Sequence, residues 1–300
     1  MKKLLLHVGY PKSASTSLQN GLFLGLHEVG LINFLGRAFE SDFYGQKQGK
    51  GEYKTWFDHI LSHGSFDANS IGQLSANIPN VLSEGLFMMN ERRTDSIAAP
   101  AVLQKYFAPH ADKIEVLIVI RRQQDLIPSY YFQNYRRFEQ KVFSDFLAHQ
   151  TSSNWAGESK IFDFYRVAKA YAQALGKDNV HIVLFEDFVQ NKTRFGAQLG
   201  SAMGVDPVAV EPLLGQEHLN KTPKEEGVVV VRKPQSKFRK RLARIAEKLK
   251  VGGPASSPIR LPGATDEEKA AIFNSFQDGN GRLADEFSLD KQAMREYRYF

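Results

Sequence analysis

The chain of 300 residues contains no cysteine and no apolar run long enough to cross a membrane. The absence of cysteine excludes disulfide bonds, thiolate catalysis and cysteine-ligated zinc, and it is compatible with a reducing cytoplasm. The first six residues resemble the head of a signal peptide, but His7, Gly9 and Pro11 interrupt the apolar stretch too early. A membrane span would need about 18 consecutive apolar residues. We therefore expect a soluble, cytoplasmic protein.

Acidic residues are fewer than basic ones. The sequence has 33 Asp and Glu residues against 39 Lys and Arg residues, which gives a net charge of +6. This balance favours anionic partners such as nucleotides, acidic glycans, nucleic acids or membrane phosphates. With 42% hydrophobic residues and no long low-complexity linker, residues 1–300 are expected to form one domain around a large core.

Apolar and amphipathic segments alternate along the chain. The apolar runs predict strands at 3–9, about 30–35, 80–84, 114–120 and 179–185. The amphipathic stretches predict helices at 15–28, 98–108, 125–138, 161–176 and 191–203, and a C-terminal helical tail at about 265–300 that Thr265 would cap. This order is typical of a three-layer α/β/α fold with a mostly parallel central sheet, in which ligands bind beyond the carboxyl ends of the strands.

A short loop with one lysine and several hydroxyl groups follows the first predicted strand. We call residues 9–17 the anion loop. Ser15, Thr16 or Ser17 can open the helix that follows, and its unpaired N–H groups, the hydroxyls and the Lys12 ammonium would converge on one phosphate or sulfate. The P-loop of nucleotide triphosphatases needs G-x-x-x-x-G-K-[ST], whose second glycine and lysine would fall on Ala14 and Ser15. A P-loop kinase is therefore a minor alternative.

A second motif follows the predicted strand at 114–120. Arg121 leaves this strand directly, and Ser129 comes eight residues later in the next predicted helix. The two side chains can hold one phosphate from two sides. Taken alone, such a pair is more often a surface charge and an early-helix residue.

The P-K-S-x-[ST]-[ST] order of the anion loop and the R-x₇-S spacing together resemble the sulfotransferases, most closely bacterial ones of the carbohydrate-sulfating type. The resemblance runs from Lys3 to about Pro212 and implies the P-loop-like sulfotransferase fold. It also implies 3′-phosphoadenosine 5′-phosphosulfate (PAPS) as the donor, with no metal required. The implied donor-binding residues are Lys12, Ser13, Ala14, Ser15, Thr16, Ser17, Arg121 and Ser129.

Two departures from the family pattern stand out. The loop usually carries glycine at the position of Ala14, and alanine would cost on the order of 1 kcal/mol there if the backbone φ is positive. The chain also lacks the R-K-G-x-x-G-D-W segment that binds the 3′-phosphate in small-molecule sulfotransferases.

Glu84, at the end of a predicted strand, is the predicted catalytic base. Its S-E-G-L-F segment resembles the glutamate-bearing segment of carbohydrate sulfotransferases. The carboxylate would take the proton of an acceptor hydroxyl while Lys12 stabilises the leaving oxygen. The alternative is an ion pair of Glu84 with Arg92 or Arg93.

Histidine is the rival base, because the small-molecule branch of the family uses one. His59 and His63 stand four residues apart, a spacing that could also bind a metal, but the chain has no H-E-x-x-H pattern and no evident third ligand. No metal site is predicted.

Residues 232–250 carry nine basic residues and one acidic residue, with apolar residues at helical spacing. Such a basic amphipathic helix could lie on an anionic membrane surface, grip an acidic glycan or cover the nucleotide. A helix packed on the core with a solvated basic face is equally compatible with the pattern.

Two classes of function follow. The first is an enzyme that transfers a sulfuryl group from PAPS to a hydroxyl of a carbohydrate or glycolipid. The second is a non-catalytic polyanion-binding protein on the same fold. The enzyme is favoured because a scaffold has no need for Lys12, Arg121 and Ser129 at these offsets, and nucleic acid is not expected as a partner.

Overall fold

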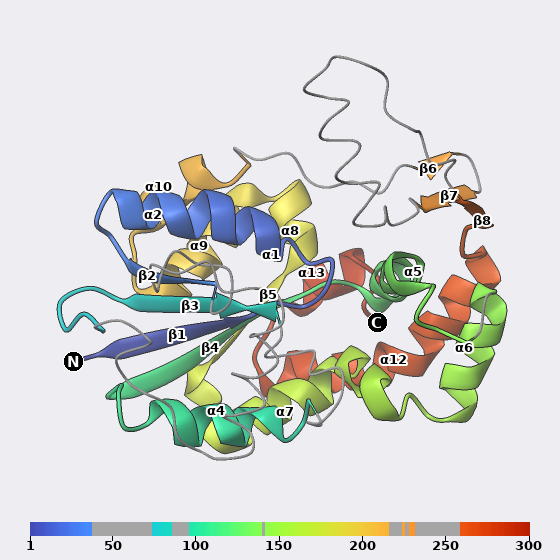
Figure 1. The fold of residues 1–300 in the computed structure, drawn as a ribbon, viewed down its shortest axis with the longest axis horizontal. Helices are drawn as coiled ribbons and strands as arrows, with labels where there is room; N and C mark the ends of the chain where they lie inside the picture. Colours follow the sequence, from blue (N-terminus) through green and yellow to red (C-terminus); the bar gives the residue numbers. More distant parts are fainter. Residues whose placement is uncertain (38–73, 86–95, 140–141, 216–223, 226–227, 232–258) are drawn as a thin grey trace, which may run out of the picture.

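The structure is a computed structural model that describes residues 1–37, 74–85, 96–139, 142–215, 224–225, 228–231 and 259–300. Its centre is a parallel sheet of five strands in the order β2-β3-β1-β4-β5 (Figure 1). The strands are β1 (Lys3–Val8), β2 (Asn33–Arg37), β3 (Asn80–Glu84), β4 (Lys113–Ile120) and β5 (Val180–Leu184).

Both faces of the sheet are covered by helices, which is why its strands are nearly continuous apolar runs. Leu4, Leu6 and Val8 of β1 are buried with residues of α4 (Ala99–Phe107) and α7 (Phe164–Leu175). Leu5 points to the opposite face, because successive side chains of a strand alternate. The elements on that face are α1 (Ser15–Ser17), the π-helix η1 (Leu18–Phe23), α2 (Leu24–Glu28), α8 (Phe185–Gln190), α9 (Lys192–Met203), α10 (Pro207–Val210) and the 3₁₀ turn η7 (Glu211–Leu213).

A group of helices extends the fold beyond the carboxyl ends of the strands (Figure 1). It contains α5 (Gln123–Asn134), α6 (Phe143–Ser152), the 3₁₀ helix η5 (Gly157–Phe162), α12 (Asp266–Glu286) and α13 (Lys291–Glu296). The 3₁₀ turn η6 (Lys177–Asn179) leads into β5, and a small antiparallel sheet joins β6 (Lys224–Glu225), β7 (Val228–Val231) and β8 (Ile259–Pro262). In the described part of the chain, no helix is both long and apolar enough to cross a membrane.

The predicted fold class, a three-layer α/β/α fold with a mostly parallel sheet, is confirmed. All five predicted strands form, and the second is displaced to Asn33–Arg37. Thr265 caps α12 in a capping box with Glu268. The helix predicted at 161–176 begins only at Phe164, because Asp163 accepts a hydrogen bond from the backbone N–H of Arg166 and so acts as its N-cap.

Other features were not predicted. The helix expected at 15–28 contains the π-helical segment η1, and α6, α8 and the small sheet had no expected counterpart. The basic segment at 232–250 lies outside the described residues.

Candidate functional site

The candidate residues follow three neighbouring strands that end at one edge of the sheet. Because β1 lies between β3 and β4, the anion loop has the end of β3 on one side and Arg121 on the other. The loop approaches its neighbours closely. A Cβ atom on Gly9 would lie 2.6 Å from Oγ of Ser15 and 3.4 Å from Cα of Gly85, so any larger residue at this turn would displace the Ser15 side chain.

Two non-glycine residues give the anion loop its shape. Lys12 has φ 62° and Ala14 has φ 60°, both in the left-handed region. The Ser15 hydroxyl donates to the carbonyl of Tyr10 over 3.3 Å, which ties the helix start back to the strand end. Ala14, at the N-cap position, has no side chain that could cap this helix start. The loop therefore has the backbone of an anion-binding turn leading into a helix.

Arg121 closes the loop from the side of β4. Its Nη1 donates to the carbonyl of Lys12 over 3.1 Å, and its guanidinium carbon lies 4.8 Å from the centre of the Phe185 ring. Because the carboxyl ends of parallel strands lie at one edge of a sheet, the loop after β1 and the residue after β4 were expected at the same edge. The strand order and this hydrogen bond bring them together. The contact joins two segments that are 109 residues apart in the sequence.

Lys12 and Arg121 thus bring two positively charged residues to one edge of the sheet. Burial lowers the pKa of the Lys12 ammonium, and the positive charge of Arg121 lowers it further. Holding both charges in a half-buried position costs free energy that an anion between them would recover. The arrangement fits a phosphate or sulfate group.

Ser129 lies on α5, partly exposed, two turns after the start of that helix. Asp125, in the first turn of α5, forms an ion pair with Arg122, whose Nε lies 2.5 Å from the Asp125 carboxylate. Of the two residues predicted to bind the 3′-phosphate, Arg121 contacts the anion loop. Ser129 lies on α5, the helix that begins two residues after Arg121.

Glu84 is the last residue of β3 and is in register with Val8 of β1. Its backbone therefore stands beside the anion loop, and its side chain lies outside the described part of the structure. The predicted alternatives for the base or its ion pair, at His59, His63, Arg92 and Arg93, also lie outside the described residues.

A buried cluster of three hydrogen-bonded polar residues lies next to the end of β3. Nδ1 of His7 lies 2.6 Å from Oγ of Ser83, and the amide of Gln19 donates to the same oxygen over 2.8 Å. Burial lowers the pKa of His7 to about 3, so this imidazole is neutral at physiological pH. His7 is therefore a packed, hydrogen-bonded residue. Gln19 belongs to the π-helix η1, and no sequence pattern predicted that this segment is π-helical.

Sequence reasoning assigned no chemistry to the acidic pair that follows β5. In the structure, Glu186 and Asp187 are both buried at the carboxyl edge of the sheet. Oε1 of Glu186 accepts the backbone N–H of Arg122 over 3.1 Å, and its Oε2 lies 2.7 Å from the hydroxyl of Tyr299. A signal was present, because acids directly after a parallel strand lie at the same edge as the other candidate residues.

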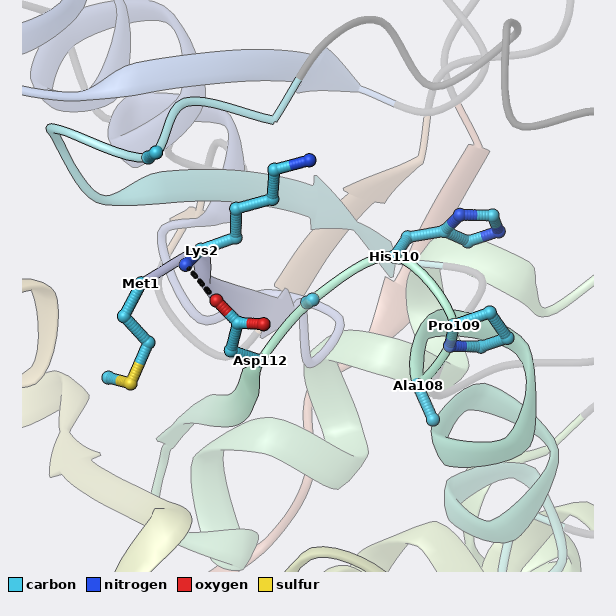
Figure 2. Close-up of a pocket in the computed structure, with 8 residues that line it drawn as sticks. Met1, Lys2, Ala108, Pro109, His110 and Asp112 are labelled. Atoms are coloured by element: carbon cyan, nitrogen blue, oxygen red, sulfur yellow. Dashed lines mark hydrogen bonds between the residues drawn. The ribbon is translucent and has the colours of Figure 1, made fainter.

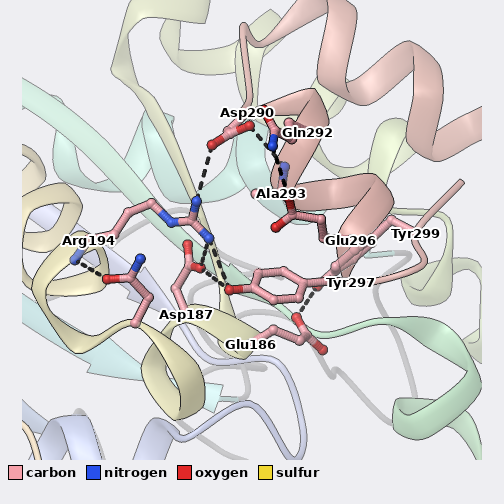
Figure 3. Close-up of polar contacts among 10 residues, drawn as sticks. Glu186, Asp187, Arg194, Asp290, Gln292, Ala293, Glu296, Tyr297 and Tyr299 are labelled. Carbon is pink, nitrogen blue, oxygen red and sulfur yellow. Dashed lines mark hydrogen bonds and ion pairs between the residues drawn. The ribbon is translucent and has the colours of Figure 1, made fainter.

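Residues 290–300, which we call the C-terminal segment, contact this acidic pair (Figure 3). The Tyr297 hydroxyl donates to Asp187 over 2.8 Å and accepts from Arg194 over 2.9 Å, and Arg194 also forms an ion pair with Asp187. A second ion pair joins Arg194 to Asp290 over 3.2 Å, just before α13. These contacts anchor the C-terminal segment to α8 and α9.

A pocket lies at the opposite end of the sheet, near the start of β1 and the turn before β4 (Figure 2). There the backbone N–H of Lys2 donates to Asp112 over 2.6 Å. The pocket adjoins neither the anion loop nor Arg121, because those residues follow the carboxyl ends of the strands. Among the described residues, no group of three or more potential ligands could hold a metal ion.

Comparisons with known proteins identify the fold. No protein-family profile matches the chain, and no curated protein matches it in sequence. A solved sulfotransferase from Alicyclobacillus acidocaldarius superposes with a TM-score of 0.52 at 14% identity, covering 97% of this chain and 98% of that one. The chain therefore has the sulfotransferase fold, as the sequence motifs predicted.

Two further solved structures align over much of the chain. A mouse sulfotransferase, SULT7A1, complexed with PAP gives a TM-score of 0.38 at 10% identity, over 98% of this chain and 85% of that one. The sulfotransferase domain from the curacin biosynthetic pathway gives 0.33 at 13% identity, over 84% and 98%.

Proposed function

We propose that this protein is a sulfotransferase that moves a sulfuryl group from PAPS to an acceptor hydroxyl. The observation that carries the proposal is the hydrogen bond from Arg121 to the Lys12 carbonyl, which joins the two predicted donor-binding motifs at one edge of a sulfotransferase fold. Neither motif alone is specific. Their contact is what a donor with phosphate groups at two positions requires.

The anion loop suits the sulfuryl end of the donor. Its backbone N–H groups and the hydroxyls of Ser13, Ser15, Thr16 and Ser17 would hold the 5′-phosphosulfate, with Ala14 contributing only backbone. The Lys12 ammonium would stabilise the charge that develops on the leaving oxygen as the bond to sulfur breaks. Arg121 and Ser129 would hold the 3′-phosphate, which does not react.

Glu84 would serve as the general base. Its position at the end of β3, in register with the last residue of β1, supports a role next to the loop. The carboxylate would accept the proton of the acceptor hydroxyl as that oxygen attacks sulfur in line with the leaving group. No metal is needed, because Lys12 and the loop supply the stabilising charge.

The acceptor is proposed to be a hydroxyl on a carbohydrate or glycolipid. The S-E-G-L-F segment around Glu84 and the basic segment at 232–250 support this assignment. The basic segment also supports peripheral contact of a cytoplasmic protein with an anionic membrane surface.

Thermal unfolding with nucleotides tests the proposed donor. 3′-Phosphoadenosine 5′-phosphate (PAP) keeps both phosphates of the donor and lacks only the sulfuryl group. It should raise the melting temperature in a concentration-dependent way. ATP with magnesium should not. Stabilisation by ATP and magnesium but not by PAP would favour a kinase. Stabilisation by heparin alone would favour the non-catalytic polyanion-binding protein.

A further inference from the structure

The peptide groups on both sides of Arg121 form hydrogen bonds with buried side chains. The residue before it, Ile120, has its carbonyl 3.2 Å from the Tyr299 hydroxyl. The residue after it, Arg122, donates its N–H to Glu186 over 3.1 Å. The Tyr299 hydroxyl has one proton, which it shares between the Glu186 carboxylate at 2.7 Å and the Ile120 carbonyl, so one buried pair contacts both peptide groups that flank Arg121.

The same short segment also holds the Arg121 side chain. Phe185, directly before Glu186, lies under the guanidinium, whose Nη1 reaches the Lys12 carbonyl. The guanidinium is thus fixed by a ring below it and a carbonyl beside it, while its backbone is fixed by the Tyr299–Glu186 pair. Tyr299 is only 1% exposed and Glu186 is 6% exposed, so water does not compete for these bonds.

We propose that Tyr299 and Glu186 are positioning residues for donor binding, which act by holding Arg121 over the anion loop. The proposal rests on the proposed function, and it gives a donor-binding role to a C-terminal segment 178 residues from Arg121 that shares no motif with it. Buried hydrogen bonds of this kind restrict a backbone to one conformation. The Arg121 guanidinium is then already in place before the ligand binds, so binding does not incur the entropy cost of ordering it.

The pKa shifts agree with a persistent bond. Burial raises the pKa of the Tyr299 hydroxyl well above its usual value, and Glu186 raises it further, so Tyr299 remains a donor at any working pH. Burial raises the pKa of Glu186 as well, while the hydrogen bonds from Tyr299 and from the Arg122 backbone act in the opposite direction.

The chain offers a matched control two residues away. Tyr297 belongs to the same C-terminal segment and is buried, but its hydroxyl contacts Asp187 and Arg194 rather than the residues next to Arg121. Tyr297→Phe and Tyr299→Phe remove the same single atom. Both weaken anchoring of the segment, and only Tyr299→Phe removes a brace from Arg121.

Calorimetric titration with PAP tests the proposal. Tyr299→Phe should weaken PAP binding on the order of tenfold, while Tyr297→Phe should stay within about twofold of the wild type. In an Arg121→Ala background, Tyr299→Phe should have no further effect, because its contribution acts through Arg121. Equal losses in the two tyrosine variants, or a loss that persists without Arg121, would overturn the proposal.

Amide hydrogen exchange separates this proposal from the proposed function. Exchange at residues 121–123 should be faster in Tyr299→Phe than in Tyr297→Phe, with or without nucleotide. Unchanged exchange would show that Tyr299 does not hold this turn, even if PAP binds. Faster exchange in Tyr299→Phe, in a protein that does not bind PAP, would show that Tyr299 holds this turn but would refute the donor assignment and any role of Tyr299 in donor binding.

Discussion

At the scale of single residues, the anion loop depends on two side chains in a backbone conformation that favours glycine. Lys12 and Ala14 both have φ near +60°. Each L-residue in this region costs about 1–2 kcal/mol relative to the right-handed region. Lys12 has a side chain that the proposed chemistry uses, whereas the methyl group of Ala14 has no such role, so Ala14 offers a test of the loop geometry.

Ala14→Gly should stabilise the protein. Relief of the left-handed strain should exceed the added entropy of the unfolded chain, for a net gain on the order of 0.5–1 kcal/mol. The measurement is urea denaturation, with Ala271→Gly as control, because Ala271 is exposed in the interior of α12. The control should lose about 1 kcal/mol. Equal destabilisation by both substitutions would contradict the left-handed loop.

Glu84→Gln should separate binding from chemistry. The amide keeps the shape of the side chain but cannot take a proton, so PAP binding and folding should persist while turnover falls on the order of a hundredfold or more. Single-turnover transfer assays would compare it with His59→Ala and His63→Ala. Normal turnover in Glu84→Gln together with an inactive histidine variant would move the base to that histidine.

At the scale of helices and strands, the sequence predicted most of what local patterns can encode. β1 and β4 were located within one residue because each is a short apolar run with a clear end, at Gly9 after β1 and at Arg121 after β4. The π-helix η1 was not predicted, and its Gln19 makes a buried hydrogen bond with Ser83, 64 residues away, that no local pattern encodes. The expected meeting of Lys12 with Arg121 followed from parallel topology, whereas no local pattern links Glu186 to Tyr299.

The amino ends of β1, β4 and β5 meet in a buried ion cluster around Glu115. Oε2 of Glu115 lies 2.6 Å from Nζ of Lys3 and 3.2 Å from Nε2 of His181, and Oε1 lies 2.5 Å from Nζ of Lys113. Burial alone would raise the pKa of this carboxyl, but the hydrogen bonds from these three partners outweigh it and lower the pKa from 4.5 to about 2.

Because the folded pKa of Glu115 lies below the unfolded value, its contribution to stability is present above pH 4.5 and is lost as the pH falls toward 2. The shift corresponds to about 3 kcal/mol. Urea denaturation of the wild type and Glu115→Gln should show a difference of this order at pH 7 that shrinks below pH 4.5. A difference that is constant down to pH 3 would assign the effect to packing instead.

At the scale of the whole molecule, the C-terminal segment returns to the edge where the sheet ends. Tyr297 and Tyr299 bring residues from the end of the chain to α8, α9 and the end of β4. The chain lacks the C-terminal 3′-phosphate motif of small-molecule sulfotransferases, so this segment is proposed to assist Arg121 rather than to contact the nucleotide. The single domain expected over residues 1–300 stays a prediction.

The basic segment at 232–250 carries nine of the 39 basic residues of the chain, and we propose that it binds an anionic acceptor or membrane surface rather than the donor. Replacing Arg239, Lys240, Arg241 and Arg244 by glutamine should leave PAP affinity unchanged but weaken binding to anionic liposomes or heparin, and the effect should diminish with added salt. Co-sedimentation and calorimetry measure the two quantities. Unchanged binding to both polyanions at low salt would assign the basic segment to ordinary packing with a solvated face.

The central claim is that Arg121 and the anion loop form one site for a donor with a 3′-phosphate. Calorimetric titration of PAP, in parallel with adenosine 5′-monophosphate, which differs from PAP only in lacking the 3′-phosphate, tests it most directly. The wild type should bind PAP at least on the order of tenfold more tightly, because a charged hydrogen bond to phosphate is worth about 1.5–3 kcal/mol. Arg121→Ala should lose this preference. Equal affinities in the wild type, or a preference that survives in Arg121→Ala, would contradict the account.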